Sequence, residues 1–262
     1  MGGVRAIRRF GRRCLTTVAR SHFGGRALAI ALDDPEVLRV ALNRLSDDLA
    51  AQGFVDEALP RDLDRIEGFE DCAWLLSSNV LNHFAARLML GEASHLFATV
   101  RGLEGTPRVV EIGRYRGGTA LLLAAAGGNV LSIDIDERLR ASDESLRAAL
   151  SRVGLEGRVE MVFADSTTFP IGAGSIDLVF VDGDHSYEGV SRDVAHWVPA
   201  LRLGGILLLH DAKWPEPSRP WNRPPDAAVL GVHRFVEELR RRSDLDEMSA
   251  PGTLVQFRYM GG

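Results

Sequence analysis

The 262-residue chain is 45% hydrophobic, carries a net charge of −5 and has a mean hydropathy of −0.02, values typical of a soluble globular protein with a real core. Its longest apolar runs are far shorter than the ~20 residues that span a bilayer, and we expect no secretory signal. The two cysteines, Cys14 and Cys72, suit neither a disulfide framework nor a zinc site. These properties exclude a membrane-spanning or disulfide-stapled protein and favour a cytoplasmic location.

The N-terminal arm, residues 1–30, is strongly basic. Seven arginines and no acidic residue occur among the first 32 residues, so this part carries +7 and the remainder −12. Apolar residues at Val4, Ile7, Leu15 and Val18 alternate with the arginines, a pattern typical of peripheral contact with an anionic membrane or a partner. A solvated arm and an organellar transit peptide are the alternatives. The acidic remainder argues against a nucleic-acid substrate, because a phosphate-binding face is basic.

A helical extension is predicted over residues 31–105. Residues 35–51 begin with a proline in a plausible first helical turn and carry apolar residues at helical spacing. A polar, acidic stretch follows at 53–68. Residues 69–103 predict one or two further helices, with a break at Gly91.

Short β-rich runs alternate with helical runs over residues 106–262. The strands are apolar almost throughout, and strands buried on both faces are typical of a parallel sheet covered by helices. The sequence therefore predicts a doubly wound α/β domain. We expect strands at 108–113, 129–136, 158–165, 176–183, 204–211 and 253–260, and helices at 119–126, 137–154, 188–201 and 232–242.

Each of the first five predicted strands ends in polar residues. Ligands of open parallel sheets bind beyond the carboxyl ends of the strands. Turns and helix caps explain one or two polar endings, but five in succession indicate one shared pocket. The endings are Glu111 to Thr119, Asp134 with Asp136, Asp165 with Ser166, Asp182 to Glu188, and His210 with Asp211.

The turn after the first strand reads EIGRYRGGT and lacks the G-x-G-x-x-G of a dinucleotide site. Its glycines let a ligand approach the backbone at a helix N-terminus, and Asp134 suits a pair of ribose hydroxyls. The carboxylate of Glu111 would repel a pyrophosphate but could hold an ammonium, unless it only caps the next helix. S-adenosylmethionine, a nucleoside with a cationic amino-acid tail, therefore fits better than NAD. An NAD-dependent oxidoreductase and a non-catalytic binding protein are the alternatives.

Five motifs occur in the order found in one enzyme family: VVEIGRYRGGTALLLA, VLSIDID, MVFADS, IDLVFVDGDHSYEGV and PALRLGGILLLHD. With them, residues 88–262 resemble the class I S-adenosylmethionine-dependent methyltransferases, and most of all the O-methyltransferases related to the catechol, macrocin and cephalosporin-pathway enzymes. The resemblance implies a Rossmann-like sheet, mostly parallel with an antiparallel last strand. LMLGEASHLFATV, residues 88–100, resembles the helix that covers the cofactor in this family.

The resemblance implies a cofactor site along the first three strand ends. Its residues would be Glu111, Gly113, Tyr115, Gly117 and Thr119 for the methionine moiety, Asp134 for the ribose, and Asp165 with Ser166 for the adenine edge.

In the metal-dependent members of this family, acids after the fourth and fifth strands bind a divalent ion. The matching residues are Asp182, His210 and Asp211, and they imply Mg²⁺ or Mn²⁺. His210 departs from the usual oxygen ligand, and an imidazole also admits Fe²⁺ or Zn²⁺. His185 is placed to act as the base that deprotonates an acceptor hydroxyl, with the metal or alone. Asp184 and Glu188 are expected to be turn and helix-start residues.

Residues 214–225, WPEPSRPWNRPP, form a Pro-rich loop with two tryptophans and two arginines. A loop of this length is either an acceptor lid or a surface connection. The expected function is therefore methylation of a hydroxyl on a small molecule such as a sugar, a glycosylated compound or an aromatic natural product. A methyltransferase of RNA or protein is less consistent, because no NPPY-like tetrapeptide follows the fourth strand. A homo-oligomer is compatible with the sequence.

Overall fold

The computed structural model describes residues 64–72, 86–213 and 227–262. The predicted arm, most of the helical extension before residue 86 and the Pro-rich loop lie outside the described residues, and the predictions made for them are not tested. Among the helices that are described, none is long and apolar enough to cross a membrane.

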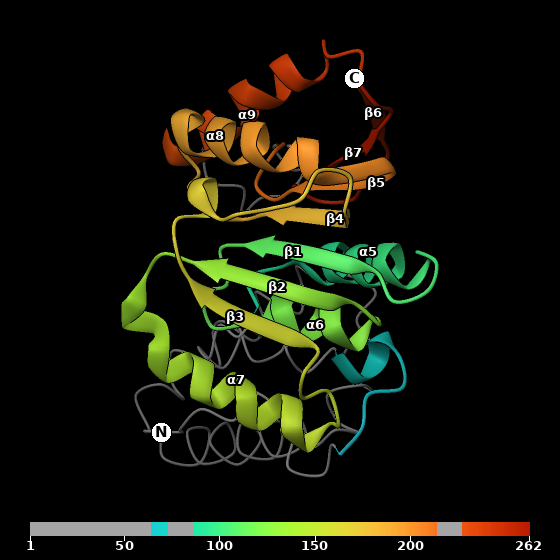
Figure 1. The fold of residues 1–262 in the computed structure, drawn as a ribbon, viewed down its shortest axis with the longest axis vertical. Coiled ribbons are helices and arrows are strands. Elements are labelled where there is room, and N and C mark those ends of the chain that lie inside the picture. The colour runs from blue at the N-terminus through green and yellow to red at the C-terminus, as the bar shows by residue number, and fades with distance from the viewer. Residues whose placement is uncertain (1–63, 73–85, 214–226) are drawn as a thin grey trace, which may run out of the picture.

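The described residues form a seven-stranded sheet with the order β3-β2-β1-β4-β5-β7-β6 (Figure 1). The strands from β1 to β5 pair in parallel, and β7 is antiparallel to both β5 and β6. This confirms the mostly parallel sheet with an antiparallel last strand. The strands are β1 (Arg108–Ile112), β2 (Asn129–Asp134), β3 (Val159–Phe163), β4 (Ile176–Val181), β5 (Leu201–Leu209), β6 (Leu245–Met248) and β7 (Val255–Tyr259).

The edge strand β6 was not predicted. Its four residues, Leu-Asp-Glu-Met, carry two charges, and Leu245 alone among them is buried. A short strand with exposed charges protects the edge of a sheet from pairing with another chain. Such a strand has no apolar run, which is the pattern by which the buried strands were predicted.

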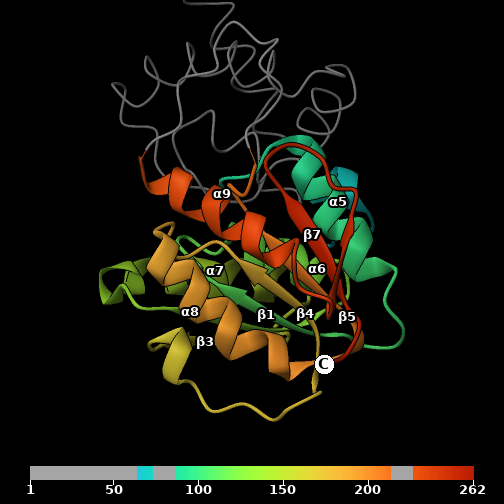
Figure 2. The ribbon, with the colours of Figure 1, turned by 90° about the horizontal axis from the view of Figure 1, so that it is seen from above.

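Helices cover both faces of the sheet (Figures 1 and 2). On one face, α5, α6 and α7 bury Leu96, Leu121 and Leu146 against β4 and β5 side chains such as Phe180 and Leu208. A second apolar cluster on the other face contains residues of α8 and α9. The helices are α5 (Leu90–Arg101), α6 (Gly118–Ala125), α7 (Arg140–Arg152), α8 (Tyr187–Trp197) and α9 (Ala227–Leu239), with short 3-10 turns η1 (Glu137–Leu139), η2 (Ser166–Thr168) and η3 (Val198–Ala200).

Helix α5 begins at Leu90, so Gly91 lies in its first turn and does not divide a longer helix within the described residues. The helix packs into the same apolar cluster as α6 and α7. The last part of the predicted extension therefore shares the core of the α/β domain.

The first residues after β4 and β5 are hydrogen-bonded to the last residues of β1 and β4. The N–H of Asp182 donates to the carbonyl of Ile112 at 2.8 Å, and the N–H of His210 donates to that of Val181 at 3.0 Å. Gly113 has a φ of +89°, and a Cβ there would overlap the carbonyl group of Asp182. Glycine is required at this point because it permits both the left-handed backbone and the close approach.

Candidate active site

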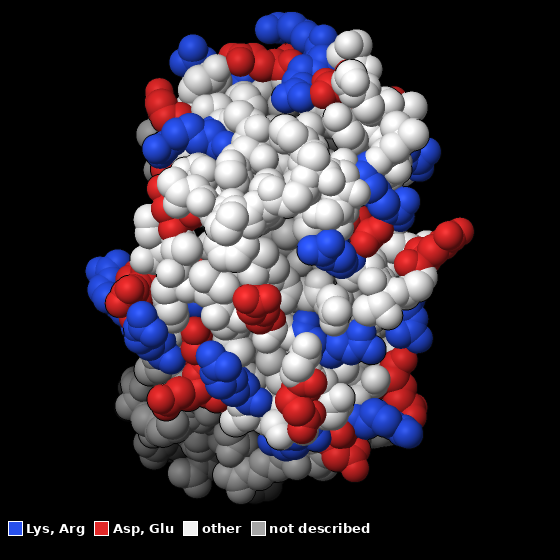
Figure 3. Space-filling view, in the orientation of Figure 1, with Lys and Arg blue, Asp and Glu red and all other residues white. Residues whose placement is uncertain are grey.

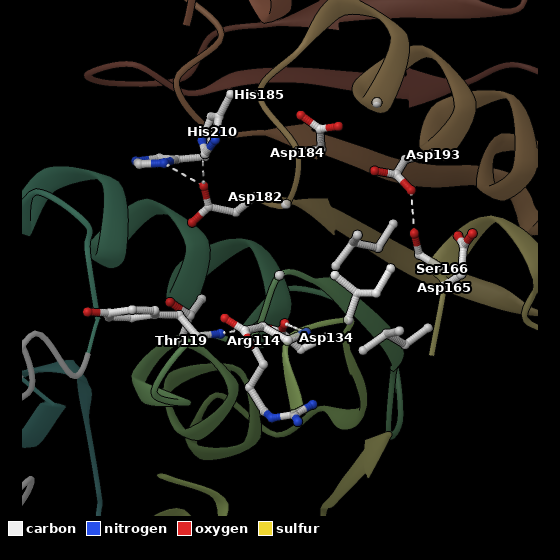
Figure 4. Close-up of a pocket in the computed structure, with 18 of the residues that line it drawn as sticks. Arg114, Thr119, Asp134, Asp165, Ser166, Asp182, Asp184, His185, Asp193 and His210 are labelled. Atoms are coloured by element: carbon white, nitrogen blue, oxygen red, sulfur yellow. Dashed lines mark hydrogen bonds and ion pairs between the residues drawn. The ribbon is translucent and has the colours of Figure 1, made fainter. Parts of the chain in front are cut away.

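A cavity of about 790 Å³ lies at the carboxyl ends of strands β1 to β5 (Figure 4). Most of the residues predicted to form the site line it, although they come from five separate strand ends. Those that line it are Gly113, Tyr115, Thr119, Asp134, Asp165, Ser166, Asp182, Asp184, His185, His210 and Asp211.

Asp134 is fixed by the backbone on both sides. Its two carboxylate oxygens accept hydrogen bonds from the N–H groups of Tyr115 and Asp136, each at 2.8 Å. Tyr115 adopts a φ of +51°, which is unusual for a bulky residue and is typical of functional turns. Each carboxylate oxygen keeps a free lone pair, so Asp134 presents a rigid acceptor pair to the cavity.

Glu111 and Gly117 do not line the cavity. Glu111 is fully buried, on the same face of β1 as Val109, and the hydroxyl of Ser132 donates to its Oε2. Its Oε1 has no hydrogen-bond partner, and burial raises the pKa of Glu111 to about 8. Glu111 was expected to contact the methionine moiety directly; in the structure it is buried and is not among the residues that line the cavity.

Gly117 is the N-cap of α6, with a φ of +82°. A Cβ there would overlap the side chain of Leu146 in α7. Its observed role is therefore to let the turn after β1 enter the helix while α7 packs against it.

At the end of β3, Asp165 and Ser166 make different contacts. Asp165 is exposed, and its Oδ1 accepts from the N–H and hydroxyl of Thr167 at 2.9 and 2.6 Å, which lowers its pKa. The hydroxyl of Ser166 donates to Asp193 at 2.5 Å. Asp193 was not predicted. It is 4% exposed and lines the cavity, and an acid three residues after Val190 on the apolar face of α8 is the signal that could have found it.

Asp182, His185, His210 and Asp211 form a cluster after β4 and β5. Nδ1 of His210 lies 3.0 Å from Oδ1 of Asp182. Nε2 of His185 lies 3.4 Å from both Asp182 Oδ1 and Asp211 Oδ2. Figure 4 shows both rings turned toward Asp182. One donor atom from each of the four side chains lies within 4.8 Å of the others, a spacing that could hold a metal ion.

The four side chains of this Asp/His cluster shift each other's ionisation. Burial opposes the charged forms, but His210 and His185 lower the pKa of Asp182 to about 2. The carboxylates of Asp182 and Asp211, each 3.4 Å from Nε2, raise the pKa of His185 to about 9. Despite its burial, the pKa of His210 is raised well above its usual value by Asp182 and Glu92. In the cluster, two negatively charged carboxylates are therefore balanced by two positively charged imidazoles.

The backbone around the cluster holds its members in place. Asp211 has a φ of +50°, and its N–H donates to the hydroxyl of Thr253 at 3.3 Å. On the other side, α9 packs against the turn that carries His185, since a Cβ at Gly231 would overlap the backbone of His185 and Tyr187. A strained residue that is held by its surroundings is typical of a functional site.

Two further residues of the DGDHSYE stretch have the structural roles that were expected. Asp184 accepts from the N–H of Ser186 at 2.8 Å and so forms a turn. Glu188 is exposed in the first turn of α8, whose N-cap is Ser186.

Two buried charged residues near the site were missed. The guanidinium of Arg114 is paired with Asp143 at 2.8 and 3.1 Å and donates to the carbonyls of Ser132 and Val162, so it ties the turn after β1 to α7. Glu92 of α5 lies 3.4 Å from Nε2 of His210. Both depend on partners 18 or more residues away in the sequence, and no local pattern marks them.

Residues 110–212 match the family model of a methyltransferase domain. The fold is similar to several solved structures at low sequence identity. SAH-bound methyltransferase PaMTH1 of Podospora anserina has a TM-score of 0.55 and 18% identity, covering 84% of this chain and 95% of that chain. An O-methyltransferase of Bacillus cereus in complex with SAH has a TM-score of 0.52 and 16% identity, covering 84% and 99%. A putative O-methyltransferase of Klebsiella pneumoniae has a TM-score of 0.50 and 20% identity, covering 69% and 86%.

Proposed function

We propose that this protein is a class I S-adenosylmethionine-dependent methyltransferase and that it transfers a methyl group to a hydroxyl oxygen of a small molecule, with a divalent ion assisting. The observation that carries the proposal is the meeting of the Asp/His cluster with the Gly113 turn and Asp134 in one cavity. The methyl group of the bound cofactor would then lie next to the Asp/His cluster, which could deprotonate the acceptor hydroxyl.

The cavity fits the cofactor in size and charge. Its volume of about 790 Å³ is in the range of small-molecule sites. Gly113 lines the cavity, and Asp134 offers paired acceptors to ribose hydroxyls. Acidic side chains in its wall favour a cation. When bound, S-adenosylmethionine supplies a methyl group on a sulfonium, ready for displacement by an oxygen nucleophile.

Asp182, His210 and Asp211 would hold the divalent ion, and their donor atoms converge closely enough to fit one. A mixed set of carboxylate oxygen and imidazole nitrogen suits Mn²⁺ better than Mg²⁺, which prefers oxygen. Such an ion would lower the pKa of a hydroxyl next to it.

His185 would take the proton of the acceptor hydroxyl at Nε2. Asp182 and Asp211 lie 3.4 Å from this atom, and both would stabilise the imidazolium that forms. The ring must be neutral before it acts. A cation bound at the two carboxylates would lower the pKa of His185 from its value of about 9 toward neutrality. If no metal binds, His185 alone would act as the base, at a pH above its pKa of about 9 where the ring is neutral.

The acceptor is proposed to be a sugar, a glycosylated compound or an aromatic natural product. An acidic wall disfavours a phosphodiester backbone, which supports a small molecule over a nucleic acid. A panel of sugars and catechols, assayed with a radiolabelled methyl donor, tests this part directly.

Cofactor binding tests the proposal without a known acceptor. S-adenosylhomocysteine should bind in calorimetry, and Asp134→Ala should weaken binding by about 1–3 kcal/mol, because buried partners lose a hydrogen bond. Glu104→Ala, which removes an exposed carboxylate outside the cavity, is the control. Tight NADH binding without any response to S-adenosylhomocysteine would contradict the proposed cofactor.

A further inference from the structure

The buried carboxylate of Glu92 connects helix α5 with the end of β5. Glu92 is 1% exposed. Its Oε1 accepts from the N–H and hydroxyl of Thr253 at 2.6 and 2.8 Å, and its Oε2 accepts from the N–H of Met89 at 2.7 Å. Oε2 also lies 3.4 Å from Nε2 of His210. One oxygen therefore binds the loop before β7, and the other faces the imidazole of the Asp/His cluster.

Donors surround this carboxylate on both oxygens. A charged carboxylate can only accept hydrogen bonds, so Nε2 of His210 must carry a hydrogen where it faces Glu92. The other nitrogen of the ring, Nδ1, then points at Asp182 Oδ1, 3.0 Å away, and at Asp211 Oδ2, 3.7 Å away. The ring is thus oriented with its Nδ1 side toward the centre of the cluster.

The loop before β7 is shaped to fit the carboxylate of Glu92. Gly252 has a φ of +62°, and a Cβ there would overlap Oε1 of Glu92. Thr253, held by that same oxygen, accepts from the N–H of Asp211 at 3.3 Å. A single side chain on α5 is therefore linked to both residues that follow β5.

We propose that Glu92 is a positioning residue: it binds the Nε2–H of His210 and so directs Nδ1 of that ring toward Asp182 and Asp211. Histidine ligands of metals commonly donate their other N–H to a carboxylate, which fixes the tautomer and the ring orientation. The orientation of the ring stands on the contacts alone. Its consequence for metal affinity rests on the proposed function.

Two measurements on Glu92→Gln test this role. Gln replaces one acceptor oxygen by a donor, so the N–H groups of Met89 or Thr253 can no longer all be satisfied. By NMR of metal-free protein with ¹⁵N-labelled histidine, the wild type should show a slowly exchanging Nε2–H of His210, assigned by its absence in His210→Gln, and Glu92→Gln should lose it. In calorimetry, Glu92→Gln should bind Mn²⁺ roughly 10–100-fold more weakly.

His95→Phe is the matched control. His95 lies on the same helix and contacts Gln256 of β7 at 2.7 Å, so this change removes a side-chain contact between α5 and the sheet without touching His210. It should lower thermal stability but leave both the Nε2–H signal of His210 and the Mn²⁺ affinity unchanged.

The outcomes separate the two proposals. Either of two NMR results overturns the positioning role: an Nε2–H of His210 that exchanges rapidly in the wild type, or one that persists in Glu92→Gln. The first result does not depend on whether Glu92→Gln folds. Equal Mn²⁺ affinity in wild type and Glu92→Gln also contradicts it. A wild type that binds no Mn²⁺ overturns the metal part of the proposed function, and the NMR result then decides the role of Glu92 by itself.

Discussion

Replacing Glu111 by Gln should stabilise the protein, and by more at neutral than at acidic pH. Glu111 is fully buried, Oε1 has no partner, and burial raises its pKa to about 8 from an ordinary value of 4.5. Gln resembles the protonated carboxyl in shape and cannot ionise. The variant therefore removes the cost of burying an ionisable group and keeps an oxygen for the hydroxyl of Ser132.

The sign and size follow from linkage between protonation and folding. A carboxyl whose pKa is raised on folding adds its full stability below the unfolded pKa, and this is lost as the pH rises through the folded pKa. Each pKa unit corresponds to 1.36 kcal/mol. Between pH 5 and pH 7.5, with a folded pKa of about 8 for Glu111, the wild type should lose about 3 kcal/mol that Glu111→Gln keeps.

Urea unfolding of both proteins at pH 5 and pH 7.5, followed by circular dichroism, measures this difference. Glu104→Gln, a change at an exposed residue, controls for the loss of one carboxyl. An advantage of Glu111→Gln that stays the same at both pH values would refute the argument from burial. Calorimetry of the same variant with S-adenosylhomocysteine tests whether Glu111 also holds the ammonium of the cofactor, as the sequence predicted.

Three further predictions concern catalysis and the N-terminal arm. Asp211→Ala should abolish methyl transfer while keeping most of the affinity for S-adenosylhomocysteine. Chelation should have the same effect on the wild type until Mg²⁺ or Mn²⁺ is restored, and full activity in EDTA would exclude a role for a metal ion. His185→Ala should lower turnover by about 10²–10⁴-fold, the usual contribution of a positioned base, and the loss in a pH–rate profile should shrink as the pH falls below the pKa of His185, because the protonated ring cannot accept a proton; an unchanged rate would exclude His185 as the base. Deleting residues 1–30 should leave the affinity for S-adenosylhomocysteine unchanged but abolish co-sedimentation with anionic liposomes. In the full-length protein this liposome binding should weaken as the salt concentration rises. If the deletion instead unfolds the protein or dissociates a dimer, the arm has a structural role.

The alternation of strands and helices was enough to predict the sheet and the edge at which the site lies. Parallel strands bring their carboxyl ends together, so Asp182, His185, His210 and Asp211 could be grouped although 29 residues separate the first from the last. Contacts between distant elements were beyond such reasoning. Glu92 reaches His210 across 118 residues, and this contact depends on how α5 packs.

The direction of side chains along β1 was a second feature that the sequence prediction of the site did not take into account. Glu111 follows Val110 and precedes Ile112, which both face the α8 and α9 side of the sheet, and side chains alternate along a strand. Glu111 therefore faces the opposite side with Val109. Its contact with the cofactor was inferred from its place at the strand end, without regard to this alternation, and stays a prediction.

The close contact at Gly113 has a consequence for how such an enzyme could acquire a new acceptor. The loop that begins at Asp182 donates a hydrogen bond to Ile112, the residue before the turn that would hold the cofactor, and it leaves no space for a Cβ at Gly113. Neither can be redesigned without displacing the other. Changes of specificity would thus have to come from other parts of the cavity wall, and a library aimed at new acceptors is best directed at lining residues outside these two loops.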